Sequence, residues 1–207
     1  MKVNALKLRI GLVVGHNHKN QGTKFALPPF TSEFSYNFMI ANELSRRIFN
    51  DLNVACLFLT NKAEQSYRKN SEQTAWELKN ADINFVLELH CNAFDGKTKI
   101  LGSEVLFTDK ILEPLTYTFQ KILLDDLGIS LHRNPKLITK NERGGMSLHS
   151  YQEQNIFGMI LEPCFIDTIN PESIELKENP QGYIESLLKF IKHIKFWYEK
   201  HYVINGI

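Results

Sequence analysis

The segment NFVLELH, residues 84–90, is a short, mainly apolar run that ends in a histidine, and the fold of this chain can be predicted from the pattern it sets. Two other runs have the same form: IGLVV at residues 10–14 leads to His16, and FGMIL at residues 157–161 leads to Glu162. Apolar runs of this length are typical of strands buried in a parallel sheet. The carboxyl ends of such strands meet at one edge, where open α/β sheets bind ligands. We therefore expect the two histidines and the glutamate to lie together at that edge.

Segments with a helical spacing of apolar residues alternate with these runs. Strands are expected at residues 7–14, 54–60, 84–90, 103–108 and 156–163, and helices at residues 33–50, 70–80, 111–127 and 180–201. This alternation predicts the α/β class, with a single domain over residues 1–207 and a mainly parallel twisted sheet flanked by helices on both faces. Residues 130–155 show no regular pattern and are expected to be the least regular part. The sequence contains no evident internal repeat, linker or second module.

The composition argues against several classes of function. The 207 residues carry a formal net charge of +1 with acids and bases mixed, so neither a nucleic-acid surface nor a polybasic membrane contact is predicted. No apolar stretch is long enough to span a bilayer, and residues 10–14 are too short for the core of a signal peptide. Cys56, Cys91 and Cys164 form no CxxC pair and lie in or beside apolar runs. Buried free thiols are therefore expected, which fits a reducing compartment.

Glu33 adds a carboxylate to the same expected edge. It opens a predicted helix that Thr31 or Ser32 can cap, and a helix that follows a strand starts near the carboxyl end of that strand. Two imidazoles and one carboxylate suit a zinc ion and leave a fourth position open for water. His16 and His18 compete for one of the histidine positions, and spacing alone does not separate them. A purely structural interpretation also exists, in which the Glu33 carboxylate interacts favourably with the helix dipole.

Glu162 is the hardest of these residues to explain structurally. It follows an apolar run and precedes Pro163, so its carboxylate is expected to be partly buried, and burial without a partner is costly. Beside a metal ion, a buried glutamate is suited to act first as a general base and then as a general acid. The sequence therefore predicts a catalytic role for this carboxylate.

Five short motifs follow one another along the chain. They are VVGHN at residues 13–17, Glu33 with Asn37 one turn later, HCNA at residues 90–93, GSEV at residues 102–105 and LEPCFID at residues 161–167. In these motifs, and from about residue 8 to about residue 195, the chain resembles the zinc-dependent N-acetylmuramoyl-L-alanine amidases of the family-3 type. That family includes bacterial cell-wall amidases and phage endolysins.

The resemblance implies both an activity and a set of site residues. It favours His16 over His18, because the family histidine directly follows the glycine, and it implies Glu33 and His90 as the other ligands of one Zn²⁺ ion. Glu162 is implied as the catalytic carboxylate. The implied reaction hydrolyses the amide bond between N-acetylmuramic acid and L-alanine of the stem peptide, so peptidoglycan or a muropeptide is the expected substrate.

Three further residues are expected near this site. Glu88 stands where the family often has a small hydroxyl residue, and alternation along the strand makes it face the same way as His90. Glu88 is therefore predicted to contact and support the residues of the site without binding the metal itself, or to pair with a nearby cation. Arg143 is predicted to bind a stem-peptide carboxylate or to polarise the scissile carbonyl, with a solvated loop arginine as the alternative. Asn92 is also predicted to bind substrate.

Two other functions compete with this one. The first is another zinc amidohydrolase or a carboxypeptidase, but a carboxypeptidase needs a compact His-x-x-Glu pair, and Lys19 stands three residues after His16. The second is a catalytically silent wall-binding relative, which the presence of all four site residues argues against. With no signal peptide and no separate wall-binding module, the chain is expected to be a prophage-type endolysin. Such a protein accumulates in the cytoplasm without inserting stably into the membrane and acts on the cell wall after release. The sequence does not predict an oligomeric state.

Overall fold

The strands form one six-stranded sheet with the order β2-β1-β3-β6-β4-β5, in a computed structural model that describes residues 7–63, 65–94 and 100–203. The strands are β1 (Arg9–Val14), β2 (Ala55–Thr60), β3 (Phe85–Leu89), β4 (Glu104–Phe107), β5 (Lys136–Leu137) and β6 (Phe157–Glu162). The helices are α1 (Glu33–Leu52), α2 (Tyr67–Asn80), α3 (Glu113–Leu127), α4 (Gly145–Glu153), α5 (Pro171–Glu178) and α6 (Pro180–Tyr198), with a 3-10 turn at Lys110–Leu112 and a π-helical turn at Glu199–Val203. The predicted α/β class is confirmed.

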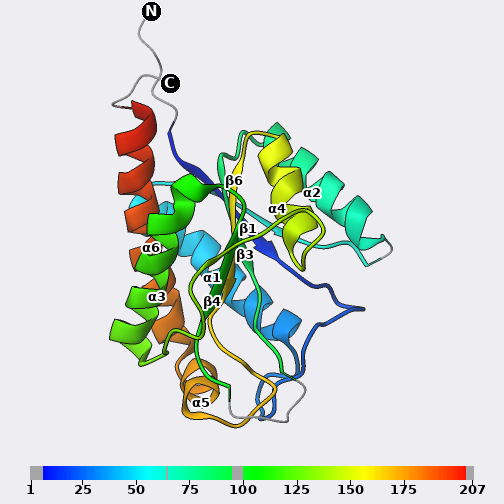
Figure 1. Ribbon diagram of the computed structural model, residues 1–207, viewed down its shortest axis with the longest axis vertical. Helices are drawn as coiled ribbons and strands as arrows, with labels where there is room; N and C mark the ends of the chain where they lie inside the picture. The colour runs from blue at the N-terminus through cyan, green and yellow to red at the C-terminus, as the bar shows by residue number, and fades with distance from the viewer. Residues whose placement is uncertain (1–6, 64, 95–99, 204–207) are drawn as a thin grey trace, which may run out of the picture.

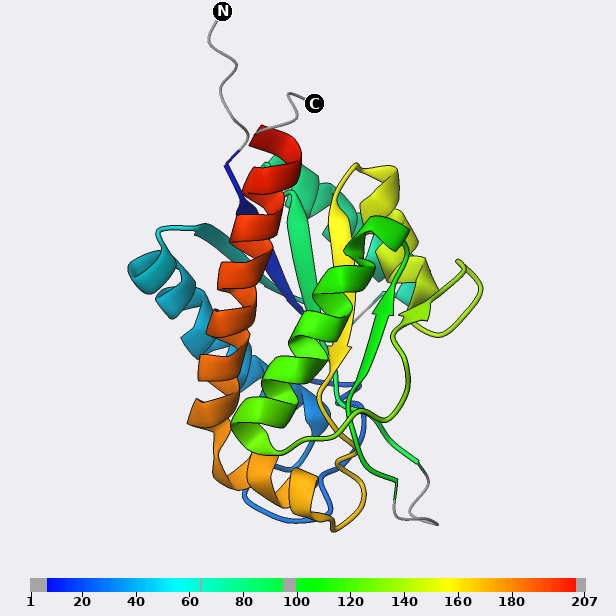
Figure 2. The same ribbon diagram turned by 60° about the vertical axis from the view of Figure 1, so that its left-hand side comes forward.

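Two apolar layers cover the sheet, one on each face. On one face α1, α3 and α6 pack over strand residues such as Leu12 and Leu87. On the other face α2 and α4 pack over Val13 and Val86. Figures 1 and 2 show this arrangement, with α3 and α6 on one side of the sheet and α2 and α4 on the other. Because successive strand residues point to opposite faces, strands that are apolar throughout are covered on both sides.

The parallel strands β1, β3 and β6 end level with one another. Val14 pairs with Leu89, and Leu89 pairs with Leu161, so the residues that follow these strands emerge at one edge of the sheet. This is the edge that the sequence predicts. Strand β4 runs antiparallel to β6 and begins there, which brings Glu104 opposite Glu162. The sheet is therefore mainly parallel, as predicted, with one antiparallel pair beside the predicted site.

Residues 130–155 are more regular than expected, because they contain β5 and the whole of α4. The glycine at the N-cap of α4, Gly144, provides no side-chain cap, so the local signals for a helix are weak. Burial of Leu148 and Tyr151 on the α2 side of the sheet stabilises α4 instead. Helix α5 also lies outside the expected helices. Within the described residues, no helix is long and apolar enough to cross a membrane.

Candidate metal centre

The start of α1 holds the Glu33 carboxylate in place. Ser32 caps the helix, accepting a hydrogen bond from the backbone of Ser35 at 3.1 Å, so Glu33 is the first helical residue. Its side chain is buried, and both carboxylate oxygens accept backbone hydrogen bonds, Oε1 from Cys91 at 2.9 Å and Oε2 from Thr23 at 3.1 Å. The carboxylate is therefore fixed between the loop after β1 and the end of β3.

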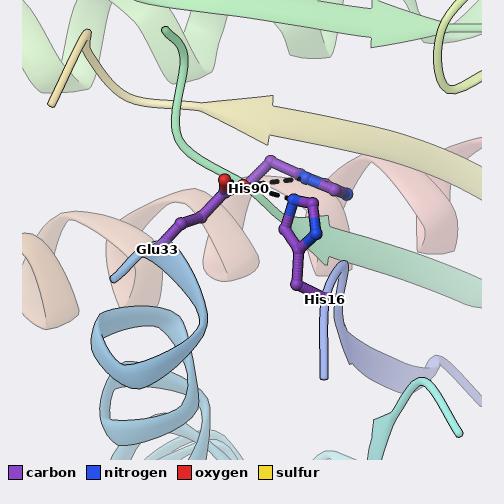
Figure 3. A group of neighbouring side chains, drawn as sticks. All are labelled: His16, Glu33 and His90. Atoms are coloured by element: carbon purple, nitrogen blue, oxygen red, sulfur yellow. Dashed lines mark hydrogen bonds and ion pairs between the residues drawn. The ribbon is translucent and has the colours of Figure 1, made fainter. Parts of the chain in front are cut away.

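Two imidazoles meet this carboxylate from separate strand ends. His16 Nε2 lies 3.1 Å from Glu33 Oε2, and His90 Nδ1 lies 2.9 Å from Glu33 Oε1. Figure 3 shows both rings pointing toward the same carboxylate. One ligand atom from each of the three residues lies within 4.8 Å of the others. Two nitrogen donors and one oxygen donor at this spacing fit a zinc ion with a position left open.

Two glycines make room for this arrangement. A Cβ atom on Gly15 would lie 1.8 Å from Nε2 of His90. A Cβ atom on Gly22 would lie 2.5 Å from Oε2 of Glu33 and 2.7 Å from Nε2 of His16, and Gly22 has a φ of +70° that side chains rarely adopt. The backbone therefore approaches the three donor residues as closely as glycine alone permits.

The charges of the site also suit a cation. Burial raises the pKa of Glu33, but the hydrogen bonds with His16 and His90 together lower it by more. The pKa of Glu33 therefore lies well below its usual range. Burial lowers the pKa of His90, but hydrogen bonds with Glu33 and Glu88 raise it to about 10. Without a metal, the buried carboxylates thus hold a proton on His90. A divalent cation would replace that proton, because a metal ligand must be deprotonated.

Glu162 lies at the end of β6 beside an arginine. Its carboxylate is buried, and Oε1 lies 3.3 Å from the Arg143 guanidinium, whose side chain is 64% exposed. Burial raises the pKa of Glu162, while Arg143 and His90 lower it and Glu104 and Glu33 raise it, with a net rise. A carboxylate that is more basic than usual is suited to accept a proton from water.

His16, His90 and Glu162 line a common cavity of about 460 Å³. Its wall includes His16, His90, Glu162 and Arg143, together with the amide side chains of Asn17, Asn20, Asn61, Gln65 and Asn70. A larger cavity of about 620 Å³ lies at the opposite edge of the sheet, near Asn84 and Phe157. None of the predicted site residues lines it, so we assign the functional site to the smaller cavity.

The remaining predicted residues differ in whether they lie at this site. His18 is exposed and stands apart from the three donors, whereas Arg143 lines the cavity. Asn92 is buried, its side-chain amide donates to Glu104 at 2.9 Å, and it does not line the cavity. Its role in substrate binding stays a prediction. Glu104 of the GSEV motif is not among the residues predicted for the site, yet it pairs with Glu162 across β4 and β6.

Comparisons with known proteins agree with this geometry. A family model described as N-acetylmuramoyl-L-alanine amidase matches residues 10–191, whereas a search of curated proteins gave no match. Among solved structures, the chain is similar to the catalytic domain of the CD27L endolysin targeting Clostridia difficile (19% identity, TM-score 0.67, covering 90% of this chain and 97% of that one). It is also similar to the amidase AmiC2 of Nostoc punctiforme (12% identity, TM-score 0.69, 91% and 97%). A third similar structure is the CwlD amidase of Clostridioides difficile, solved in complex with the GerS lipoprotein (18% identity, TM-score 0.67, 95% and 98%). At these identities the solved structures show a shared fold.

Proposed function

This chain belongs to the N-acetylmuramoyl-L-alanine amidase family, and on that basis we propose that it is a zinc-dependent hydrolase of peptidoglycan. The bond cleaved is the amide between the lactyl group of N-acetylmuramic acid and L-alanine of the stem peptide. One observation carries the proposal: His16 and His90, which flank the Glu33 carboxylate, line the same cavity as the buried Glu162.

His16, Glu33 and His90 would hold the zinc ion. When bound, zinc supplies a Lewis acid that lowers the pKa of water and polarises the scissile carbonyl. The protein contributes the rigidity of the site, since two backbone amides hold Glu33 and a parallel sheet holds the two strand ends. This fixed geometry limits the reorganisation that the reaction requires.

Glu162 carries the proton through the reaction. As the water oxygen forms a bond to the carbonyl carbon, the Glu162 carboxylate accepts a proton from that water. The same proton then passes to the amide nitrogen as the C–N bond breaks, which releases the amine of L-alanine and leaves a carboxylic acid on the lactyl group. Burial, which raises the pKa of Glu162, makes it a better base for the first transfer and keeps it competent for the second.

The cavity wall suits a substrate rich in amides. Asn17, Asn20, Asn61 and Gln65 line the cavity, and amide side chains carry both hydrogen-bond donors and acceptors. Arg143 extends an exposed guanidinium beside Glu162, and a guanidinium binds carboxylates well. We assign Arg143 to a carboxylate of the stem peptide or to the scissile carbonyl itself.

Digestion of purified peptidoglycan tests this function. The protein is incubated with peptidoglycan alone, with a chelator, and with a chelator followed by added zinc, and the new ends are identified by mass spectrometry. We expect free stem peptides with N-terminal L-alanine, their loss on chelation, and their return with zinc. The control is Glu162→Gln, which preserves the shape of the side chain and should keep zinc while losing about 10²- to 10⁴-fold in turnover. Bound zinc with different product ends would identify another amidohydrolase, and bound zinc with no products would identify a silent relative.

We also propose that the protein acts as an endolysin of prophage type, accumulating in the cytoplasm and reaching the wall after release. Support comes from the similarity to an endolysin catalytic domain that the chain covers almost entirely. Expression in a bacterial host with a susceptible wall should cause lysis only when the inner membrane is permeabilised. Lysis without permeabilisation would contradict this route.

A further inference from the structure

A buried carboxylate contacts one of the histidines of the proposed metal centre. Glu88, on β3, is 1% exposed, and its Oε1 lies 3.1 Å from Nε2 of His90. Its other oxygen, Oε2, accepts a hydrogen bond from the hydroxyl group of Tyr151 at 3.0 Å. Glu88 is not among the residues that line the cavity. Its direct contact with the metal centre is therefore through the ring of His90.

The two edges of the His90 ring face different carboxylates. Nδ1 points to Glu33, where the His16 ring also points, and Nε2 points to Glu88. The two nitrogens are separated by Cε1 and their lone pairs diverge, and Glu88 is not part of the group of close donor atoms formed by His16, Glu33 and His90. Glu88 is consequently a partner of the ligand and not a ligand itself.

This contact fixes which ring nitrogen of His90 keeps its hydrogen when a metal binds. Both nitrogens face a carboxylate, so both can donate a hydrogen bond while no metal is bound. A metal at Nδ1 would replace the hydrogen there, and Nε2 would keep its hydrogen as the donor to Glu88. Metal-binding histidines commonly donate their second N–H to a carboxylate, which orients the ring and raises its basicity. We infer that Glu88, held by Tyr151 of α4, is a positioning residue that presents Nδ1 of His90 to the metal. The inference rests on the proposed zinc site.

Tyr151 fixes the carboxylate from the opposite side. The Tyr151 side chain is 1% exposed and packs in the apolar layer between α4 and the sheet. A buried carboxylate without partners is costly, and here one oxygen is satisfied by the ring and the other by the phenol. Helix α4 is thereby connected to a metal ligand 61 residues earlier in the chain, since Tyr151 and His90 share Glu88.

Zinc affinity tests this role more directly than activity does. We would measure the zinc dissociation constant of each variant by competition with a chromophoric chelator, and the absorption spectrum of the cobalt-substituted protein. Glu88→Ala should weaken zinc binding about 10- to 100-fold. Glu88→Gln keeps an acceptor oxygen for Nε2 and should recover most of that loss. Tyr151→Phe should weaken binding less, and should have no further effect in the Glu88→Ala background.

Glu172 provides a matched control. It is a similarly buried carboxylate, on α5, that accepts hydrogen bonds from Ser130 instead of from a metal ligand. Glu172→Ala should lower thermal stability and leave the zinc dissociation constant unchanged. If Glu88→Ala binds zinc as tightly as the wild-type protein, the inference is overturned. If Glu88→Ala does not fold, Tyr151→Phe decides, and wild-type zinc affinity in Tyr151→Phe would then overturn the inference.

The outcome can be separated from that of the proposed function. A wild-type protein that binds zinc but releases no stem peptides would refute the amidase proposal, while the zinc affinities would still test Glu88. A wild-type protein that cleaves peptidoglycan, with Glu88→Ala unchanged in zinc affinity, would refute only the positioning role.

Discussion

Substitution of Gly15 by alanine should dismantle the metal centre without unfolding the protein. The new Cβ would lie 1.8 Å from Nε2 and 1.9 Å from Cε1 of His90. Gly15 has little freedom to retreat, because its N–H donates to the Leu89 carbonyl at 3.2 Å and its own carbonyl accepts a hydrogen bond from Asn61. The backbone of His90 is also held, since its N–H donates to Leu161. The imidazole ring must therefore move.

The size of that movement sets the expected effect. An ordinary van der Waals separation begins near 3.4 Å, and the added Cβ would lie 1.8 Å from Nε2 of His90. The ring must therefore move away by roughly 1.6 Å. A shift of that size breaks the contacts of His90 with both Glu33 and Glu88, which are 2.9 Å and 3.1 Å long. A misplacement of about 1 Å commonly costs about 10²-fold in rate, equivalent to about 2.7 kcal/mol in the activation barrier. We expect at least that loss in turnover, together with weaker zinc binding.

The assay compares Gly15→Ala with Gly128→Ala. Gly128 ends α3 at a φ of +66° with open space around its Cα, so a side chain there brings backbone strain of about 1–2 kcal/mol and no clash. Gly128→Ala should lower the free energy of unfolding in urea and leave zinc affinity and turnover intact. Gly15→Ala should instead weaken zinc binding and lower turnover, with a smaller effect on the free energy of unfolding. Wild-type zinc affinity and turnover in Gly15→Ala would refute the reasoning, because they would show that the His90 ring can keep its position beside a Cβ atom on residue 15.

Three further predictions concern the cap of α1, the core and pH. Ser32→Ala removes the cap of α1 and should lower the free energy of unfolding by about 1 kcal/mol in urea titrations, whereas no change would mean that the cap is dispensable. Tyr36→Phe removes the buried hydrogen bond to the Leu176 carbonyl and should lower the free energy of unfolding by about 0.5–1.5 kcal/mol. An unchanged melting temperature in calorimetry would contradict this prediction. Burial raises the pKa of Glu162 and Arg143 lowers it, so Arg143→Ala should raise that pKa and move the acid limb of kcat/KM to higher pH; a shift to lower pH would count against Glu162 as the base.

Much of the site could be predicted from local patterns. The apolar runs at residues 10–14 and 157–161 show where strands end, and the residues that follow parallel strands must emerge at one edge. The serine before Glu33 marks the start of α1 in the same way. These signals depend on a few neighbouring residues, so they can be recognised without the rest of the fold. The preference for His16 over His18 comes from the family resemblance; in the structure His16 lies beside Glu33 and His18 is exposed.

Other features depend on packing between distant segments. Helix α4 has weak local signals and is stabilised by burial on the sheet, so local patterns do not predict it. The pairing of Glu104 with Glu162 follows from the antiparallel direction of β4, which no local pattern encodes. The same holds for Arg143, whose contact with Glu162 follows from the path of the loop before α4.

Local sequence patterns are enough to predict the α/β class, the ends of the main strands and the identity of the residues that follow them. Which atoms of those residues face one another depends on how distant segments pack together. Glu88 illustrates the difference: alternation along β3 predicts that it shares a side with His90, but its contact with Tyr151 joins residues 63 positions apart. The physical reason is that backbone periodicity is set locally, whereas the partner of a buried charge depends on which helix covers it.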